Sequence, residues 1–389
     1  MKTPRHILFV SHNYPTSAEP NQGAFVEEMV RAVARAGTRC TVVAPVPAHT
    51  YGRRRPASQG EGLHPSEETM IKVFRPYYLS LSSRNIASYN SFQATLFFFQ
   101  RAVLRVLRQI DSEPDVVYGH FLYSGGATAV RIGIKQDTPS FVAVGESSFW
   151  TVEPLGVEQA RRDFRHVTGV IAVSSVLKRR LTSELNIPEE KIRVFPNGVD
   201  LVRFSPINKQ EARAIYGFPQ NSFIVAFVGH FDERKGVDRV IDATRELEGV
   251  DVVYAGSGPL RPEGLNVLFA NVLTHGQVPA LLSSADVFVL PTRAEGCCNA
   301  VIEAMACGLP IITSMGDFMD NIVNDKVAIR IDPDDAAAIR NAIIRLRDNP
   351  GLRATMAAAA IEHSKSFDIN ERARLVLEWM AERGGGLTV

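Results

Sequence analysis

The stretch PTRAEGCCNAVIEAMACGLPII, residues 291–312, decides the fold class of this chain. An apolar, β-branched segment leads into it, and a helix is predicted from Asn299 to Cys307, closed by Gly308. A helix that only fills a core carries large apolar residues on its buried face. This helix instead carries small residues, Ala300 among them, so we expect another group to come close to its backbone.

Two glutamates flank the start of that helix: Glu295 in the preceding loop and Glu303 inside the helix. In parallel α/β sheets, ligands bind where strands end and helices begin, and the free N–H groups there attract phosphate. The glutamates would then suit hydroxyl groups on either side of a diphosphate, with Glu295 towards a sugar and Glu303 towards a ribose. The spacing alone favours the simpler interpretation, a capped surface helix with two solvated glutamates.

Predicted strands and helices alternate along the whole chain, which indicates an α/β architecture with parallel sheets. The strands fall into two series, each with a glycine-containing turn after its first strand. The first series comprises HILFVSH, CTVVAPV, DVVYGH, SFVAVGE, GVIAVSS and KIRVFPNGVD. The second comprises FIVAFVGHF, VDVVYAGSGP, VLTHGQV (residues 272–278), ADVFVLPT and LPIITS.

Two series of strands predict two Rossmann-like domains, which the length of 389 residues accommodates. We place the first domain at residues 1–200 and the second at residues 201–366, with the junction near 197–208, where turn residues break the pattern. The helical end, residues 367–389, is expected to pack back on the first domain.

The composition is that of an ordinary globular protein, with 45% hydrophobic and 22% charged residues. The four cysteines show neither metal-ligand spacing nor a disulfide framework, so we expect reduced, structural thiols. The apolar runs are too short for a membrane span or a secretory signal, which predicts a cytosolic protein.

The net charge of +1 hides an asymmetry, because residues 1–200 carry a net charge of +6 and the remainder −5. A basic half indicates an anionic partner, such as a phosphate, an acidic sugar or an anionic membrane. A solvated surface explains the imbalance about equally well.

Two further turns have the character of binding loops. Lys235, in VGHFDERKG, lies in a predicted strand-to-helix turn, where an ammonium can neutralise a diphosphate. Gly256 and Gly258, in YAGSGP, form a second glycine turn after a strand. Each turn alone is a weak signal, but together with residues 291–312 and in this order they are specific.

In combination these motifs resemble the GT-B glycosyltransferases of family 4. The resemblance rests on the E-x7-E run with EAMACGLP, on the upstream KG, on GSGP and ADVFVLPT, and on IRVFPNGVD at the junction. It covers nearly the whole chain and is strongest between residues 190 and 312. It implies two facing Rossmann-like domains with the active site in the cleft between them. It also implies a nucleotide-diphosphate sugar held mainly by the C-terminal domain, and transfer with retention of anomeric configuration.

The resemblance implies roles for individual residues of this chain. Lys235 would bind the diphosphate, Glu303 the ribose and Glu295 the transferred sugar, while Asn299 would open the phosphate-binding helix. The implied donor-binding residues are Gly23, His230, Lys235, Gly256, Gly258, Glu295, Asn299, Ala300 and Glu303. The implied catalytic residues are His120, Glu295 and Lys235.

No cofactor beyond the nucleotide sugar is expected, because this fold does not usually require a metal for its chemistry. The D-x-D pattern at residues 332–335 precedes a predicted helix, and aspartate at a helix start is the expected N-cap. We therefore predict no metal site there.

The N-terminal half matches the family less tightly. Gly23 lies in the first strand-to-helix loop, but Gln22 replaces the second glycine that the family often has. His120 ends a strand where the family has an active-site histidine, although a loop histidine bonded to backbone is the simpler alternative. His230 stands where arginine is usual, and a mostly neutral imidazole would leave the diphosphate to other cations. Glu146, in VAVGESSFW, could bind the acceptor, act as a base or be a structural carboxylate.

Two basic segments raise the prospect of contact with an anionic membrane. Arg53–Arg55 lie in a Pro- and Gly-rich segment, residues 44–68. The helical segment 92–110 places three arginines on a face opposite a strongly apolar one: Arg101, Arg105 and Arg108. That pattern suits a membrane-surface helix, but an ordinary helix packed on the sheet with a solvated basic edge is favoured.

The predicted function is that of a retaining glycosyltransferase, which moves a hexose-type sugar from a UDP- or GDP-linked donor to a hydroxyl acceptor. The acceptor could be a lipid-linked or an envelope or capsular polysaccharide precursor, reached from the cytoplasm or the inner face of the membrane. No nucleic-acid partner is expected. Two alternatives stay open: a nucleotide-sugar epimerase of the same architecture, with His120 and Glu146 as its acid–base pair, and a non-catalytic sugar-nucleotide-binding scaffold.

Overall fold

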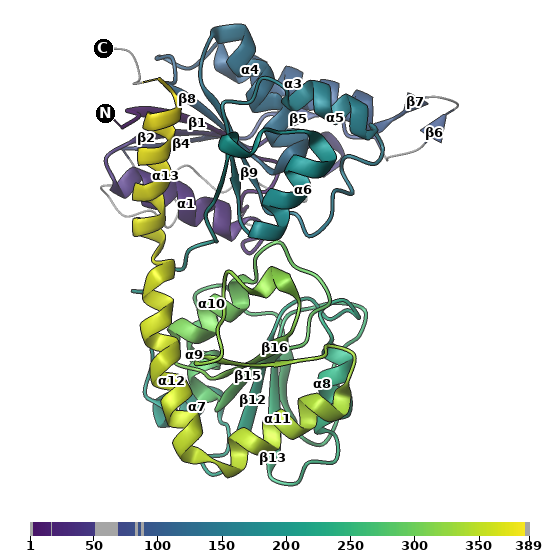
Figure 1. The fold of residues 1–389 in the computed structure, drawn as a ribbon, viewed down its shortest axis with the longest axis vertical. Coiled ribbons are helices and arrows are strands. Elements are labelled where there is room, and N and C mark those ends of the chain that lie inside the picture. Colours follow the sequence, from purple (N-terminus) through teal and green to yellow (C-terminus); the bar gives the residue numbers. More distant parts are fainter. Residues whose placement is uncertain (1–2, 17, 51–68, 82–84, 87–88, 386–389) are drawn as a thin grey trace. The chain divides into compact units, whose positions relative to one another are not determined.

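The structure is a computed structural model that describes residues 3–16, 18–50, 69–81, 85–86 and 89–385. The chain divides into two compact units (Figure 1). Unit 1 consists of Met1–Pro196 with Ile369–Val389, and unit 2 consists of Asn197–Asp368. The basic run Arg53–Arg55 lies outside the described residues.

Unit 1 is built on a seven-stranded parallel sheet in the order β11-β10-β9-β8-β1-β2-β4. Its strands are β1 (His6–Val10), β2 (Arg39–Val43), β4 (Ile71–Phe74), β8 (Val116–His120), β9 (Ser140–Val144), β10 (Gly169–Ala172) and β11 (Ile192–Val194). Two short pairs lie outside this sheet: β3 (Val46–Pro47) with β5 (Tyr77–Tyr78), and β6 (Asn85–Ile86) with β7 (Tyr89–Asn90). The central strands are almost wholly apolar and buried, as helices on both faces of a parallel sheet require.

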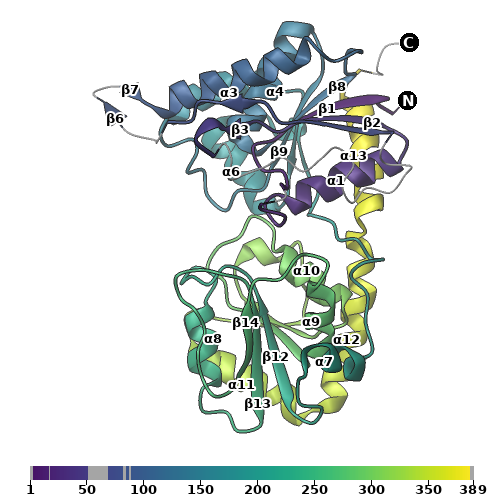
Figure 2. The ribbon, with the colours of Figure 1, turned by 180° about the vertical axis from the view of Figure 1, so that it is seen from behind.

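Helices cover both faces of that sheet (Figures 1 and 2). They are α1 (Ala24–Arg35), α3 (Phe92–Leu107), α4 (Ala127–Gln136), α5 (Val157–Phe164), α6 (Ser175–Leu185) and α13 (Ile369–Arg383). The C-terminal α13 packs against α1, and its Trp379 ring lies 5.5 Å from the ring of Phe141 and 5.9 Å from that of Phe195. The chain therefore returns to unit 1 after completing unit 2.

The opposite face of the unit 1 sheet is covered by α3 and α4. Phe99 and Val103 of α3 and Ile132 of α4 pack on Leu8 and Val117 of the sheet. This confirms the favoured interpretation of the segment at 92–110, an amphipathic helix packed on the sheet. Its basic residues remain exposed.

Unit 2 repeats the architecture with a six-stranded parallel sheet in the order β14-β13-β12-β15-β16-β17. Its strands are β12 (Phe223–Val228), β13 (Val250–Ala255), β14 (Val267–Asn271), β15 (Val287–Leu290), β16 (Ile311–Ser314) and β17 (Ala328–Ile331). Its helices are α7 (Lys209–Tyr216), α8 (Val237–Thr244), α9 (Val278–Ser284), α10 (Asn299–Ala306), α11 (Ala336–Asp348) and α12 (Pro350–Ser364). Asp335 caps α11 by accepting a hydrogen bond from the Ala338 N–H, as predicted for the D-x-D run.

One predicted strand is wrong. The segment VLTHGQV, residues 272–278, is a turn that leads into α9, and the strand β14 lies just before it at Val267–Asn271. The cause is local, because Gln277 Oε1 accepts hydrogen bonds from both the N–H and the hydroxyl of Thr274, at 3.0 and 2.9 Å. A side chain that closes a turn in this way competes with extension of the strand.

Within the described part of the chain, no helix has the length and apolar character needed to cross a membrane.

Candidate active site

The loop after β15 brings polar groups to the carboxyl edge of the unit 2 sheet. It leads into α10, whose first turn is capped by no side chain among the described residues. The first N–H groups of a helix have no partner inside the helix, and the helix dipole makes this end attractive to anions. The Asn299 side chain accepts a hydrogen bond from Asn197 Nδ2 at 2.8 Å, and Ala300 is half-buried. The start of α10 is thus anchored, and the N–H groups of Asn299 and Val301 donate to the carbonyl oxygens of Cys297 and Cys298.

Lys235 and Glu295 form a buried ion pair beside this helix start. The Lys235 ammonium lies 2.5 Å from Glu295 Oε1, and the two side chains are only 15% and 9% exposed. Thr292 donates its hydroxyl to the same oxygen at 2.9 Å, and Arg234 Nη1 lies 3.4 Å from it. Burial alone lowers the pKa of Lys235, but the charge and hydrogen bond of Glu295 outweigh it and raise the pKa above its usual value. Lys235 is therefore a fixed cation at neutral pH.

The turn between β12 and α8 holds Lys235 in place. Asp232 Oδ1 accepts a hydrogen bond from the Lys235 N–H at 2.8 Å, and Gly236 caps α8 with a left-handed φ of 81°. A Cβ atom at Gly236 would lie 2.6 Å from the carbonyl oxygen of Pro291, so only glycine lets this turn pack on the β15–α10 loop. The exposed His230 ring lies 3.1 Å from the second oxygen of Asp232, which places it next to the same turn.

Gly256 and Gly258 lie where the turn after β13 crosses the turn after β12. A Cβ atom at Gly256 would lie 1.9 Å from the carbonyl oxygen of Gly229, and one at Gly258 would lie 2.4 Å from that of Phe231. Backbone packing between the two turns therefore explains both glycines without any ligand.

Glu303 belongs to a chain of three polar side chains. His275 Nε2 lies 3.0 Å from Glu303 Oε1, and Arg203 Nη1 lies 3.1 Å from His275 Nδ1. Arginine can only donate, so Nδ1 is the accepting nitrogen and Nε2 carries the proton that His275 donates to Glu303. The His275 ring also packs against Phe204, with the ring centroids 5.0 Å apart. One carboxylate oxygen of Glu303 therefore already accepts a hydrogen bond from within the protein.

In unit 1, His120 lies at the carboxyl end of β8 and is almost fully buried. Its ring contacts those of Phe25 and Phe121, with centroids 5.2 and 4.6 Å away. Burial, with the positive charge of Arg372, lowers the pKa of His120 to about 3, so the imidazole is neutral at physiological pH. A neutral imidazole can donate one hydrogen bond and accept another but brings no charge.

Glu146 lies just after β9, which pairs with β8, so its carboxyl group and His120 share one edge of the sheet. Its two oxygens accept hydrogen bonds from the N–H groups of Leu122 at 2.6 Å and Gly145 at 3.0 Å. Leu122 belongs to the irregular helical turn η2 (Phe121–Gly126) that follows His120. Burial raises the pKa of Glu146 to about 7 in spite of these bonds. The carboxyl group therefore holds the backbone next to His120.

Gly23 precedes α1 in a left-handed conformation, with a φ of 75°. A Cβ atom there would lie 2.6 Å from the carbonyl group of Asn13, so the first loop of unit 1 folds closely on itself at this glycine. His12 lies in that loop, and burial lowers its pKa to about 4.

Neither the site in unit 2 nor the site in unit 1 contains a set of metal ligands among the described residues. Among the described residues there is no group of three or more histidine, cysteine, aspartate or glutamate side chains that could hold a metal ion. The four cysteines are free thiols, and burial raises the pKa of Cys307 to about 12.

Comparison with known proteins identifies the family. Residues 22–203 match the model of glycosyltransferase family 4, and residues 208–363 match the model of glycosyl transferases group 1. TuaC of Bacillus subtilis, a glycosyltransferase whose name assigns it to teichuronic acid biosynthesis, is 28% identical over 87% of this chain and 88% of its own. The D-inositol 3-phosphate glycosyltransferase of Mycolicibacterium smegmatis is 26% identical over 94% of this chain and 88% of its own. The chain is a family 4-like glycosyltransferase.

Solved structures show that this glycosyltransferase has the GT-B fold. The sucrose-phosphate synthase of Thermosynechococcus elongatus superposes with a TM-score of 0.75 at 19% identity, covering 97% of this chain and 98% of that one. HepE of Anabaena in complex with UDP-glucose superposes with a TM-score of 0.71 at 17% identity, covering 97% and 99%. The predicted α/β class with two Rossmann-like domains is confirmed.

Several polar residues at these sites were not predicted from the sequence. His275 and Arg203 hold Glu303, Thr292 holds Glu295, and His12 lies in the loop of Gly23. Only His12 carries a usable signal, because it lies two residues after an apolar strand. The segment around His275 is instead predicted as strand, which hides its role as a loop histidine.

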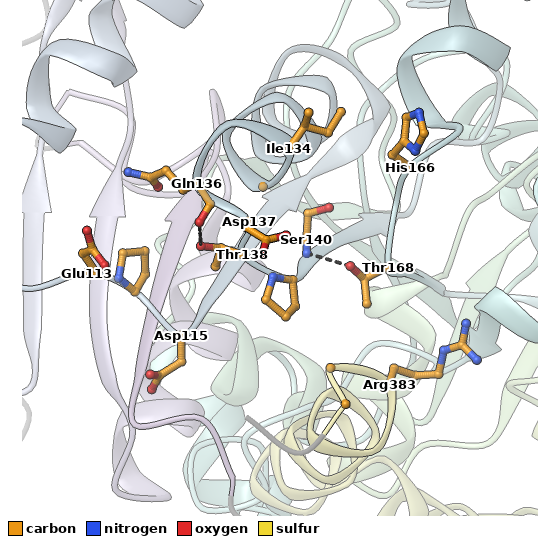
Figure 3. Close-up of a pocket in the computed structure, with 15 residues that line it drawn as sticks. Glu113, Asp115, Ile134, Gln136, Asp137, Thr138, Ser140, His166, Thr168 and Arg383 are labelled. Atoms are coloured by element: carbon orange, nitrogen blue, oxygen red, sulfur yellow. Dashed lines mark hydrogen bonds between the residues drawn. The ribbon is translucent and has the colours of Figure 1, made fainter. Parts of the chain in front are cut away.

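A hollow of unit 1 lies at the amino ends of its strands, on the edge of the sheet opposite that of His120 and Glu146 (Figure 3). It has a volume of about 870 Å³ and is lined by residues that precede β8, β9 and β10, among them Asp115, Thr138 and Thr168. Thr168 closes its wall by accepting a hydrogen bond from the Ser140 N–H at 3.0 Å. Because ligands of open α/β sheets bind at the carboxyl ends of the strands, this hollow is on the wrong edge for the transfer chemistry.

Proposed function

We propose that this glycosyltransferase transfers a hexose-type sugar from a UDP- or GDP-linked donor to a hydroxyl acceptor, with retention of anomeric configuration. The observation that carries the proposal is the convergence of Lys235, Glu295 and the start of α10 at the carboxyl edge of unit 2. A buried lysine and the positive end of a helix dipole attract a diphosphate, and a carboxylate beside them attracts sugar hydroxyls.

In this proposal the bond between the sugar C1 and the phosphate oxygen breaks, and its electron pair leaves with the nucleoside diphosphate. The Lys235 ammonium and the positive end of the α10 dipole stabilise that charge. The acceptor oxygen bonds to C1 from the same face, and its proton passes to the departing phosphate oxygen. Glu295 holds the sugar hydroxyls and stabilises the positive charge that develops near C1.

Glu303 is assigned to the ribose hydroxyls, because His275 occupies one of its oxygens and leaves the other for the ligand. Donors with uridine diphosphate are the first to test, since HepE was solved with UDP and with UDP-glucose. We further propose that the reaction needs no metal, because Lys235 and the helix start supply positive charge to the diphosphate.

The acceptor side is assigned to unit 1. His120 and Glu146 share one edge of its sheet, and a neutral, buried His120 is suited to a hydrogen bond with a hydroxyl group. We propose a lipid-linked or envelope polysaccharide precursor as the acceptor. The name of TuaC, which refers to teichuronic acid biosynthesis, supports this class.

The test is calorimetric binding of UDP, GDP and ADP to the full chain and to Glu303→Ala, with Glu362→Ala on the exposed side of α12 as the matched control. We expect one nucleotide to bind, Glu303→Ala to weaken it at least tenfold, and the control to leave it unchanged. Nucleotide release from the corresponding sugars, with magnetic resonance of the product anomer, then reports transfer and retention.

Other outcomes would replace the proposal. Interconversion of the donor sugar without an acceptor would establish an epimerase instead. Nucleotide binding without release or transfer, for every acceptor tried, would establish a non-catalytic scaffold. Loss of activity in the presence of a chelator would contradict the metal-free mechanism.

A further inference from the structure

The surface formed by α3 and α4 of unit 1 is strongly basic. Together the two helices, with the C-cap residues that follow them, carry five cationic side chains and one acidic one, Asp137 at the end of α4. The five are exposed: Arg101, Arg105, Arg108, Arg131 and Lys135. We refer to the exposed side of these two helices as the α3–α4 face.

On α3, the basic residues continue a line that begins with an aromatic ring. Phe97, Arg101, Arg105 and Arg108 follow one another at helical spacing and so lie along one side of the helix. Phe97 is 49% exposed, and the Arg101 guanidinium lies 5.9 Å from its ring centroid. A large apolar ring is therefore presented to the outside among cations.

On α4, the same combination recurs. Ile134 is 60% exposed and lies between Arg131 and Lys135 on the same side of the helix. Arg131 donates a hydrogen bond to Gln100 Oε1 of α3 at 2.6 Å, which fixes the two helices side by side (Figure 2).

A hollow of about 580 Å³ opens between α3, α4 and α5 within the same face. Its walls combine apolar and cationic side chains, including Leu96, Phe97, Ile134, Arg131, Lys135 and Arg162. Its single acidic residue, Asp163, already accepts hydrogen bonds from the Tyr123 hydroxyl at 2.7 Å and from Gln159 at 2.8 Å. The hollow is therefore positive as well as partly apolar.

We propose that the α3–α4 face docks the protein on an anionic lipid bilayer, with the hollow receiving a lipid headgroup phosphate. Basic residues next to a bilayer attract anionic lipids, and apolar side chains at the same level enter the boundary of the acyl chains. A soluble polyanion would use the cations alone and would leave Phe97 and Ile134 in water. This inference concerns unit 1 only and goes beyond the proposed transfer reaction.

The experiment is co-sedimentation of the full chain with vesicles of phosphatidylcholine, alone or mixed with phosphatidylglycerol. We expect binding only to the mixed vesicles, and weaker binding at high salt because ions screen the surface charges. Since each basic residue near an anionic surface strengthens binding by roughly fivefold, Arg101→Gln with Arg105→Gln should weaken binding by roughly 25-fold. The matched control, Lys326→Gln with Arg345→Gln on exposed sites of unit 2, should bind like the wild type.

A second pair of variants separates a bilayer from a polyanion. Phe97→Ser with Ile134→Ser should weaken vesicle binding at least tenfold while leaving nucleotide binding by unit 2 unchanged, which also shows that the chain is folded. Three results would overturn the proposal: no binding to mixed vesicles, equal binding to neutral ones, or unchanged binding by the arginine pair. Competition by inorganic polyphosphate, with no effect of the Phe97 and Ile134 changes, would assign the face to soluble polyanions instead.

Discussion

The ammonium of Lys235 lies 2.5 Å from the carboxylate of Glu295, and both side chains are nearly buried. Removing one partner from a buried ion pair leaves the other charge unpaired, which costs more than loss of the pair as a whole. The pair therefore couples the diphosphate and sugar positions of the proposed donor site.

We expect Lys235→Ala to lower kcat by roughly 100- to 1,000-fold, because it removes the cation that stabilises the leaving diphosphate. Glu295→Ala should also lower kcat, and the double variant should lose less than the product of the two single losses. Steady-state kinetics of all three variants measure these losses in kcat, with Lys326→Ala at an exposed site as the control. Multiplicative losses would show that the two residues act independently.

His275→Ala should weaken nucleotide binding by roughly tenfold, because a hydrogen bond to a charged group contributes about 1.5–3 kcal/mol. His275→Gln, which can still donate to Glu303, should recover part of the affinity. Calorimetric titration with the nucleotide is the measurement. His363→Gln is the histidine control within unit 2, because its ring bonds to the Ile322 carbonyl oxygen and lies against Phe367 instead of contacting Glu303. If His275→Ala binds the nucleotide as tightly as the wild type does, His275 does not position Glu303.

Gly256→Ala should destabilise unit 2 by about 1–3 kcal/mol or more, because its Cβ would meet the Gly229 carbonyl oxygen at 1.9 Å. Gly351→Ala is the matched control, since it lies in the first turn of α12 with only one atom within 4 Å of its Cβ position. We expect its melting temperature to be unchanged or slightly higher. A Gly256→Ala protein that melts like the wild type would show that the two turns move apart at little cost.

Glu146 should make the stability of unit 1 depend on pH. Its pKa is raised from 4.5 to about 7 in the folded chain, so between these values the unfolded chain releases a proton that the folded chain keeps. The contribution of Glu146 to stability is therefore greatest below pH 4.5, falls as the pH rises towards 7, and changes no further above it, by roughly 3 kcal/mol in total. The stability difference between wild type and Glu146→Gln, measured by thermal melts across this range, should follow that course. A difference that stays constant with pH would show that Glu146 ionises normally.

The alternation of apolar strands and amphipathic helices was sufficient to predict the two Rossmann-like units. Strands that are buried on both faces have to be continuously apolar, and this leaves a pattern that local sequence carries. The same holds for the start of α10, because strand, loop and helix are contiguous in residues 287–306. The N-cap role of Asp335 was also readable, since capping is a contact between near neighbours.

What only the tertiary structure decided is which distant side chains meet. Arg203, His275 and Glu303 come from three separate segments, and nothing local in the sequence joins them. Gly256 was predicted to bind the donor, but the crossing of two turns already requires a residue without a side chain there. Sequence patterns record periodic burial and local capping, whereas contacts between the ends of different strands exist only once the sheet has brought those ends together.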